Sequence, residues 1–238
     1  MKRLLLAATT IGVMVLPIAG HSTLIINAQG GAGPVQNIAT SATDIAQGNA
    51  TLSNGLTVVM SASSNAPGAG GVAELFSSTT EIVNPTASTQ TAVLFFVQST
   101  FTNPLVPPNA VLTNNASGTW TNNAGTSTAG AIACVDPSNV ALITEISCPA
   151  GSTSTPLQMG TVTALNGSFN AVPSSVTVTT PLTSYALTEH IVISIAPGGN
   201  FNLTNSESLA TVGTPEPATL GLLGTGLLGL VFLRRRHG

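Results

Sequence analysis

Positive charge is almost absent from the sequence. All five Lys and Arg residues of the 238-residue chain lie at its two ends, and none occurs between Leu4 and Leu233. Because contacts with phosphate groups require cationic side chains, we expect no nucleic acid partner for this span. The eight Asp and Glu residues are scattered along it, without the spacing of a calcium loop or an acidic tail.

Charged residues of both signs make up only 5% of the chain, against about a quarter in a typical protein. Ser, Thr, Asn, Gly and Ala take their places, which predicts a polar but nearly uncharged surface. The motifs CxxC, HExxH and GxSxG are also missing. We therefore expect no enzyme activity, no cofactor and no metal. A glycan hydrolase would need two carboxylates about 5 to 10 Å apart, and the sequence does not visibly pair any.

The N-terminus is typical of a secretory signal peptide. Lys2 and Arg3 form a positive segment, and Leu4 to Leu16 form an apolar segment too short to span a bilayer comfortably. We favour cleavage after Gly20, which makes residues 1–20 the signal peptide, over cleavage after Ala28. A retained N-terminal anchor is the alternative.

The C-terminus combines three parts with different physical roles. Thr214 to Pro217 reads TPEP, and it precedes the uncharged segment Ala218 to Leu233 and a run of three arginines. As a helix, this segment would be about 24 Å long against a hydrocarbon core of about 30 Å, which predicts a marginal membrane anchor. The arginines would stay in the cytoplasm and place the preceding domain outside.

These three parts, in this order over residues 213–238, resemble the PEP-CTERM sorting signal of bacterial envelope proteins. In that family an exosortase recognises the signal, and the proteins are linked with exopolysaccharide and with the cell surface or biofilm matrix. The resemblance indicates a destination rather than an activity. It implies a recognition motif and a stop-transfer cluster, formed respectively by Pro215, Glu216, Pro217 and by Arg234, Arg235, Arg236.

Residues 21–212, between the two signals, have the periodicity of β-strands. Leu56, Val58 and Met60 fall on one face of an alternating segment, and Ala92 to Val97 is an apolar run typical of a strand buried on both faces. Many such strands with turn residues between them predict an all-β fold, an antiparallel β-sandwich that is Ig-like or jelly-roll-like. The Ser-, Thr- and Gly-rich pieces 28–55 and 113–130 are expected to be loose loops.

The two cysteines, Cys134 and Cys148, belong to an exported chain, so a disulfide is the default expectation. If Asp136 to Asn139 forms a hairpin turn, Cys148 lies about 24 Å beyond the position opposite Cys134, whereas a bridge needs Cα atoms within about 7 Å. The bridge therefore requires residues 135–147 to leave the sheet and return. We favour this excursion over two free, buried thiols.

Few side chains between the signals are candidates for binding. Trp120 or Tyr185 exposed in a cleft would indicate a carbohydrate-binding module, although a lone Trp in a small sandwich is usually a core residue. His190 falls on the polar face of its strand and is expected to be solvated. Glu189 falls on the apolar face, so the strand is expected to begin after it or to lie at an edge; a buried carboxyl of functional pKa is the alternative.

Together these features predict a structural or interaction protein of the cell surface or extracellular matrix, associated with exopolysaccharide and biofilm. A carbohydrate-binding or adhesin module is the alternative. The expected partners are an exosortase-type processing enzyme, the membrane through the helix 218–233, and exopolysaccharide. The protein is expected to be exported, anchored transiently in the inner membrane, and then moved to the envelope surface or matrix.

Overall fold

The computed structural model describes residues 22–104, 109–141 and 147–211. The predicted signal peptide and the predicted sorting signal with its helix lie outside these residues. The described residues form β-strands joined by turns and loops, without any helix. None of them therefore belongs to a helix that could cross a membrane.

The strands form two antiparallel sheets of seven strands each. The first sheet has the order β10-β8-β13-β6-β1-β2, with β9 beside β8, and the second has the order β11-β7-β14-β5-β4-β3, with β12 beside β7. The strands of the first sheet are β1 (Leu24–Gly30), β2 (Val35–Ser41), β6 (Gln90–Phe101), β8 (Ser127–Asp136), β9 (Thr153–Ser154), β10 (Gln158–Val162) and β13 (Tyr185–Ile195). Those of the second are β3 (Ile45–Thr51), β4 (Thr57–Ser64), β5 (Val72–Val83), β7 (Ala110–Thr121), β11 (Gly167–Asn170), β12 (Ser174–Val178) and β14 (Asn200–Thr211).

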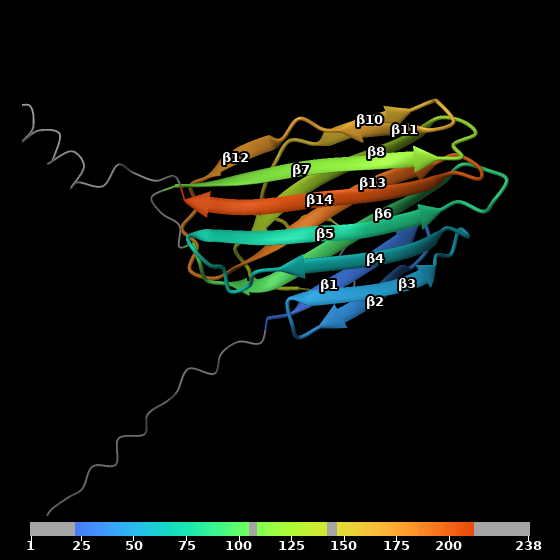
Figure 1. Cartoon of the computed structure of the whole chain (residues 1–238). Coiled ribbons are helices and arrows are strands. Elements are labelled where there is room, and N and C mark those ends of the chain that lie inside the picture. Colours follow the sequence, from blue (N-terminus) through green and yellow to red (C-terminus); the bar gives the residue numbers. More distant parts are fainter. Residues whose placement is uncertain (1–21, 105–108, 142–146, 212–238) are drawn as a thin grey trace, which may run out of the picture.

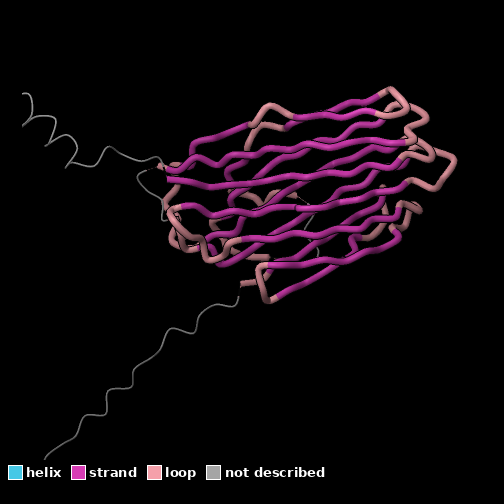
Figure 2. The backbone as a smooth tube through the Cα atoms, in the orientation of Figure 1, coloured by secondary structure: helices cyan, strands magenta, loops and turns pink. Residues whose placement is uncertain are grey.

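The two sheets pack face to face as two layers (Figures 1 and 2). One core of buried side chains lies between them, with Leu24 and Phe96 from the first sheet and Leu112 and Phe201 from the second. Such a layered arrangement lets each sheet bury one apolar face. The prediction of an all-β protein with antiparallel sheets is confirmed.

The chain crosses repeatedly from one sheet to the other. The connections β5–β6, β7–β8, β10–β11 and β13–β14 each join strands of different sheets. These crossings place consecutive strands on opposite sides of the shared core.

The predicted strands are present where the apolar pattern was clear. Val58 and Met60 are buried residues of β4, and Ala92 to Val97 lies in β6, where both faces are largely buried. The prediction of loose loops at 28–55 and 113–130 is wrong, because these pieces contain β2 and β3, most of β7 and the start of β8. Several of their inward residues are small, as at Ala46 and Ala116, which weakens the apolar alternation.

Cys134 and Cys148 form a disulfide, with their Cα atoms 6.0 Å apart. β8 ends at Asp136, and the chain later returns to β8 as β9, where Ser154 lies opposite Cys134. The expected excursion is therefore confirmed over the described residues on either side of 142–146.

This excursion covers part of the outer face of the first sheet. A second, smaller apolar cluster on that face consists of Ile25, Phe95, Val97 and Ala186, and Ala141 packs against it. All four are at most 2% exposed. The disulfide thus ties down the segment whose Ala141 packs against these apolar strand residues.

Candidate functional site

Two glutamates, one from each sheet, point into the interior of the sandwich. Glu189 on β13 and Glu207 on β14 are both 0% exposed. The expectation that the strand begins after Glu189, or lies at an edge, is wrong: β13 begins at Tyr185 and pairs with β6 and β8 on its two sides. Glu189 is in phase with inward residues such as Ile191 and is a buried carboxyl, while a functional role for it stays a prediction.

Each glutamate reaches toward the opposite sheet. Glu189 lies close to Ser77 and Asn205 of the second sheet, and Glu207 lies close to the main chain of Thr188 and Cys134 in the first. The β5 strand carries a bulge next to Ser77, and bulges re-aim nearby groups. The two carboxyls therefore form a reciprocal contact between the sheets.

Burial dominates the electrostatics of this carboxyl pair. It raises the pKa of Glu189 to about 8, although Ser77 and Asn205 partly lower it. The pKa of Glu207 is raised well above its usual range by burial and then by the charge of Glu189. Burial and Glu207 also raise the pKa of Tyr185. No Lys or Arg exists between residues 4 and 233, so no cationic side chain of this span can neutralise the two carboxylates. Protonation neutralises them instead.

The pair is enclosed rather than open to substrate. The carboxylate oxygens of both glutamates are buried and lack a hydrogen bond of ordinary geometry, as do the side-chain amides of Asn114 and Asn205. Neither glutamate lines the hollows found on the outer surface of the described residues. A glycoside hydrolase needs its two carboxyls beside a bound sugar, and this arrangement offers no such access.

The aromatic candidates are also buried. Trp120 is 1% exposed and stacks on Phe201 with ring centroids 4.2 Å apart. Tyr185 is 0% exposed, and its hydroxyl donates to the Pro104 carbonyl at 3.3 Å. Both are core residues, so neither forms a sugar platform in a cleft.

His190 lies on the outward face of β13, as its phase predicts, but it is half-buried rather than fully solvated. Its ring centroid is 6.2 Å from that of Phe95. Burial lowers the pKa of His190, so the ring is neutral near pH 7.

The outer face of the second sheet is a polar surface. Its outward side chains are mainly hydroxyls and amides, and they alternate with the buried residues of each strand. Glu74 and Glu81 on β5 are its carboxylates in the described strands. The hydroxyl and amide residues of this outer face are Gln47, Asn49, Thr51, Thr57, Ser61, Ser63, Thr113, Asn115, Ser117, Thr119, Ser168, Asn170, Ser175, Thr177, Asn202, Thr204, Ser206 and Ser208.

Phe76 lies within this outer face and is half-buried. Its register neighbours are Ser63 on β4 and Ser206 on β14. Sequence reasoning missed it, although Ala73, Leu75 and Ser77 define the inward phase of β5 and so place Phe76 outward. It is an aromatic ring flanked by serines on the two neighbouring strands.

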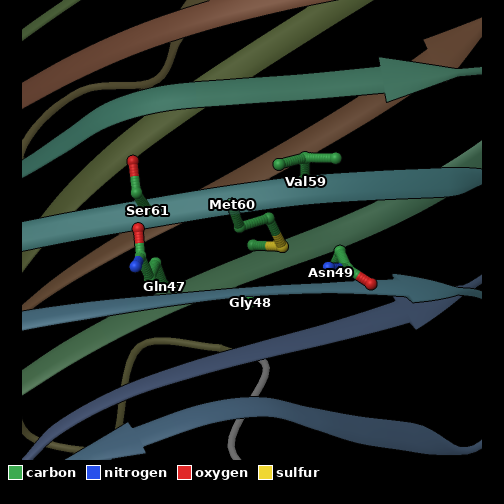
Figure 3. A pocket seen from close by; sticks show the side chains of 6 residues that line it. All are labelled: Gln47, Gly48, Asn49, Val59, Met60 and Ser61. Carbon is green, nitrogen blue, oxygen red and sulfur yellow. The ribbon is translucent and has the colours of Figure 1, made fainter.

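Two shallow hollows lie on the same outer face. One is lined by Gln47, Gly48 and Asn49 of β3 and by neighbouring residues of β4, as Figure 3 shows. The other lies over β11, β7 and β14, where Thr119 and Asn202 are among the lining residues. Both hollows combine neutral polar side chains with apolar ones, such as Val59 in the first and Phe169 in the second. The described residues contain no group of three His, Cys, Asp or Glu side chains that could hold a metal ion.

The C-terminal segment identifies how the protein is sorted. A family model of the PEP-CTERM protein-sorting motif matches residues 214–236. The chain carries a PEP-CTERM sorting motif. It is therefore an exported, envelope-associated protein that is sorted by an exosortase. No curated protein matches the chain.

The PEP-CTERM match contains both groups of residues that the sequence singled out. Pro215, Glu216 and Pro217 lie at its start, and Arg234 to Arg236 lie at its end. The recognition role of the first group and the stop-transfer role of the second stay predictions. The motif says nothing about the activity of the β domain.

Proposed function

We propose that this PEP-CTERM protein is a structural protein of the cell surface or extracellular matrix, without enzymatic activity, whose β domain associates with neutral exopolysaccharide. After export, the helix 218–233 holds it in the inner membrane until the exosortase acts. The observation that carries the proposal is the outer face of the second sheet, which is rich in hydroxyl and amide groups.

Neutral polysaccharides suit such a surface chemically. Their hydroxyl groups both donate and accept hydrogen bonds, as do Ser, Thr, Asn and Gln side chains. The absence of Lys and Arg between residues 4 and 233 removes any attraction of the β domain to phosphate or to acidic glycans. Many weak contacts along one polymer add up through multivalency, so a repeated surface needs no deep pocket.

A carbohydrate-binding module is the second candidate, and Phe76 favours it. A half-buried aromatic ring with Ser63 and Ser206 beside it offers an apolar plane next to hydrogen-bonding groups. Binding through Phe76 would be saturable and selective for one sugar, whereas binding through the whole outer face would depend mainly on polymer length.

Binding to the host's purified exopolysaccharide tests the proposal. The full-length protein is compared with Phe76→Ala and with Val192→Ala, a control on the outer face of the first sheet, where Val192 is 44% exposed. We expect Phe76→Ala to weaken binding about threefold to tenfold, the range given by the loss of one aromatic contact. The Val192→Ala variant should bind as the parent does. A parent that fails to bind the polymer contradicts the proposed association.

The sorting motif is tested separately in the native host. Replacing Pro215, Glu216 and Pro217 by Ala leaves the hydrophobic segment and the arginines intact, so unprocessed protein should accumulate in the membrane. Mass measurement and fractionation give the result, with an exosortase-deficient strain as the control. Normal maturation of the alanine variant would show that the proposed recognition residues are not the ones read.

A further inference from the structure

The two sides of the sandwich differ in how their edges are protected. On one side both sheets end in short strands: β9 and β10 share the edge of β8, and β11 and β12 share the edge of β7. Short edge strands are one way in which proteins prevent edge-to-edge pairing. On the other side the edges are the seven-residue strands β2 and β3, which lie side by side in Figure 1.

The edge of β2 is interrupted by a bulge. The β1–β2 pairing passes from Ala39 opposite Ile26 to Asn37 opposite Asn27, which leaves Ile38 without an opposite residue. The Ile38 carbonyl oxygen turns toward β3, where it would lie 2.5 Å from a Cβ atom at Gly48. A bulge twists an edge away from an incoming strand.

The edge of β3, unlike that of β2, is not interrupted by a bulge. It pairs with β4 in unbroken register, from Ile45 opposite Ser63 to Thr51 opposite Thr57. Its sequence, IAQGNAT, contains neither a charged residue nor a proline. Ile45 at its start is 66% exposed. A straight, uncharged edge of this kind is a template for another strand.

The free hydrogen-bonding groups of β3 follow from the ladder. The Leu52 amide donates to the Leu56 carbonyl at 2.7 Å. Hydrogen-bonded pairs recur at every second residue of an antiparallel ladder, so Gly48 bonds to β4. The main-chain N–H and C=O groups of Gln47 and Asn49 therefore point away from β4, toward the free edge.

We propose that β3 pairs with β3 of a second copy of this chain, antiparallel about a two-fold axis at Gly48, so that the second sheets of two molecules become one continuous sheet. In this register Gln47 lies opposite the partner's Asn49, and the two-fold axis generates a second, equivalent pair. Both pairs form hydrogen bonds through the free main-chain groups. The two outer faces rich in hydroxyls and amides then adjoin.

A second copy fits this edge because the edge is complementary to itself. The side-chain amides of Gln47 and the partner's Asn49 both donate and accept hydrogen bonds on the outer face. Gly48 has no side chain at the axis, where the two copies approach most closely. The lack of charge on β3 removes the repulsion that two identical charged edges would experience.

Analytical ultracentrifugation of the full chain in a nonionic detergent tests the proposal. Asn49→Lys and Asn202→Lys both replace an exposed Asn on the outer face, but Asn202 belongs to the central strand β14. Because an edge lysine opposes strand pairing, we expect Asn49→Lys to raise the dimer dissociation constant about tenfold or more. The Asn202→Lys variant should dimerise like the parent. A parent that stays monomeric, or equal dimerisation of Asn49→Lys, overturns the proposal.

Cysteine substitutions test the register. A mixture of Gln47→Cys and Asn49→Cys proteins should form a crosslinked heterodimer under mild oxidation, detected on a non-reducing gel. Each variant alone should crosslink much less, because identical positions are diagonal rather than opposite in this register. A mixture of Gln47→Cys with Asn202→Cys is the control. Crosslinking that is stronger within either single variant than in the first mixture overturns the axis at Gly48.

Discussion

The inner and outer faces of the second sheet have opposite characters. The inner face holds Glu207 together with the amides of Asn114 and Asn205, all 0% exposed. The outer face exposes neutral hydroxyl and amide groups to solvent. The chain has few ionisable side chains, and it places two of them, Glu189 and Glu207, where water does not reach. The stability of this protein should therefore respond to pH through its interior, while its surface chemistry should respond little.

The largest expected effect is the loss of stability as pH rises. The folded-state pKa of Glu189 is raised to about 8, so between pH 4.5 and 8 the folded protein holds a proton that the unfolded chain has lost. The free energy of unfolding should fall through this window by on the order of 4 kcal/mol from Glu189, at roughly 1.4 kcal/mol per pH unit. The raised pKa of Glu207 acts in the same direction. Urea unfolding at pH 5 and pH 8 measures the difference.

The control for this pH dependence is the pair of isosteric variants Glu189→Gln and Glu207→Gln. An amide does not ionise in this range, so each variant should lose its part of the slope and become less sensitive to pH. If the parent has the same free energy of unfolding at pH 5 and pH 8, the two carboxyls are not held as neutral groups inside the folded protein.

The second effect concerns the other sheet, whose outer face is partly covered. Cys148→Ser opens the 15-residue loop from Cys134 to Cys148, which the chain-entropy model rates at about 3 kcal/mol. It also frees the segment whose Ala141 packs against the cluster of Phe95 and Val97, so binding of an apolar dye should increase. Chemical unfolding and dye fluorescence measure both results.

Ser147→Ala provides the matched control for the disulfide variant, since it changes an exposed neighbour and keeps the bridge. It should unfold like the parent. A Cys148→Ser protein as stable as the parent, with no added dye binding, would mean that the excursion stays in place without the bridge.

Much of the fold could be predicted because apolar alternation records burial directly. Ala92 to Val97 indicated a strand buried on both faces, and β6 has that burial. The prediction for the pieces 28–55 and 113–130 was wrong because several of their inward residues are small, as at Ala46 and Ala116. Their composition is typical of loops, but their residues still alternate between inward and outward with the period of two of a β-strand.

Only one of the two buried glutamates could be singled out from the sequence. Glu189 could be singled out because it interrupts an apolar face, whereas Glu207 stands in the polar segment Asn205 to Ser208, whose composition gives no sign of burial. Its phase with Phe201 and Leu203 was the available signal. The pairing of the two glutamates depends on which strands face each other across the sandwich, and that is a property of topology that one sequence does not reveal.

The smallest expected effect on stability comes from the outer face of the second sheet. It can be compared with an effect on the inner face within the single strand β14. Asn202 and Asn205 both belong to β14, but Asn202 points outward and is exposed, while Asn205 points inward beside Glu189. Asn202→Ala should change the free energy of unfolding by no more than about 0.5 kcal/mol, because no buried group loses a partner.

Asn205→Ala should lower the free energy of unfolding by roughly 1 to 3 kcal/mol, because it removes a polar neighbour of a fully buried carboxyl. It should also raise the pKa of Glu189 further, since Asn205 partly lowers it. Urea unfolding of both variants at several pH values separates the two faces, and equal costs for the two substitutions would mean that the inner amide contributes no more to stability than the outer one.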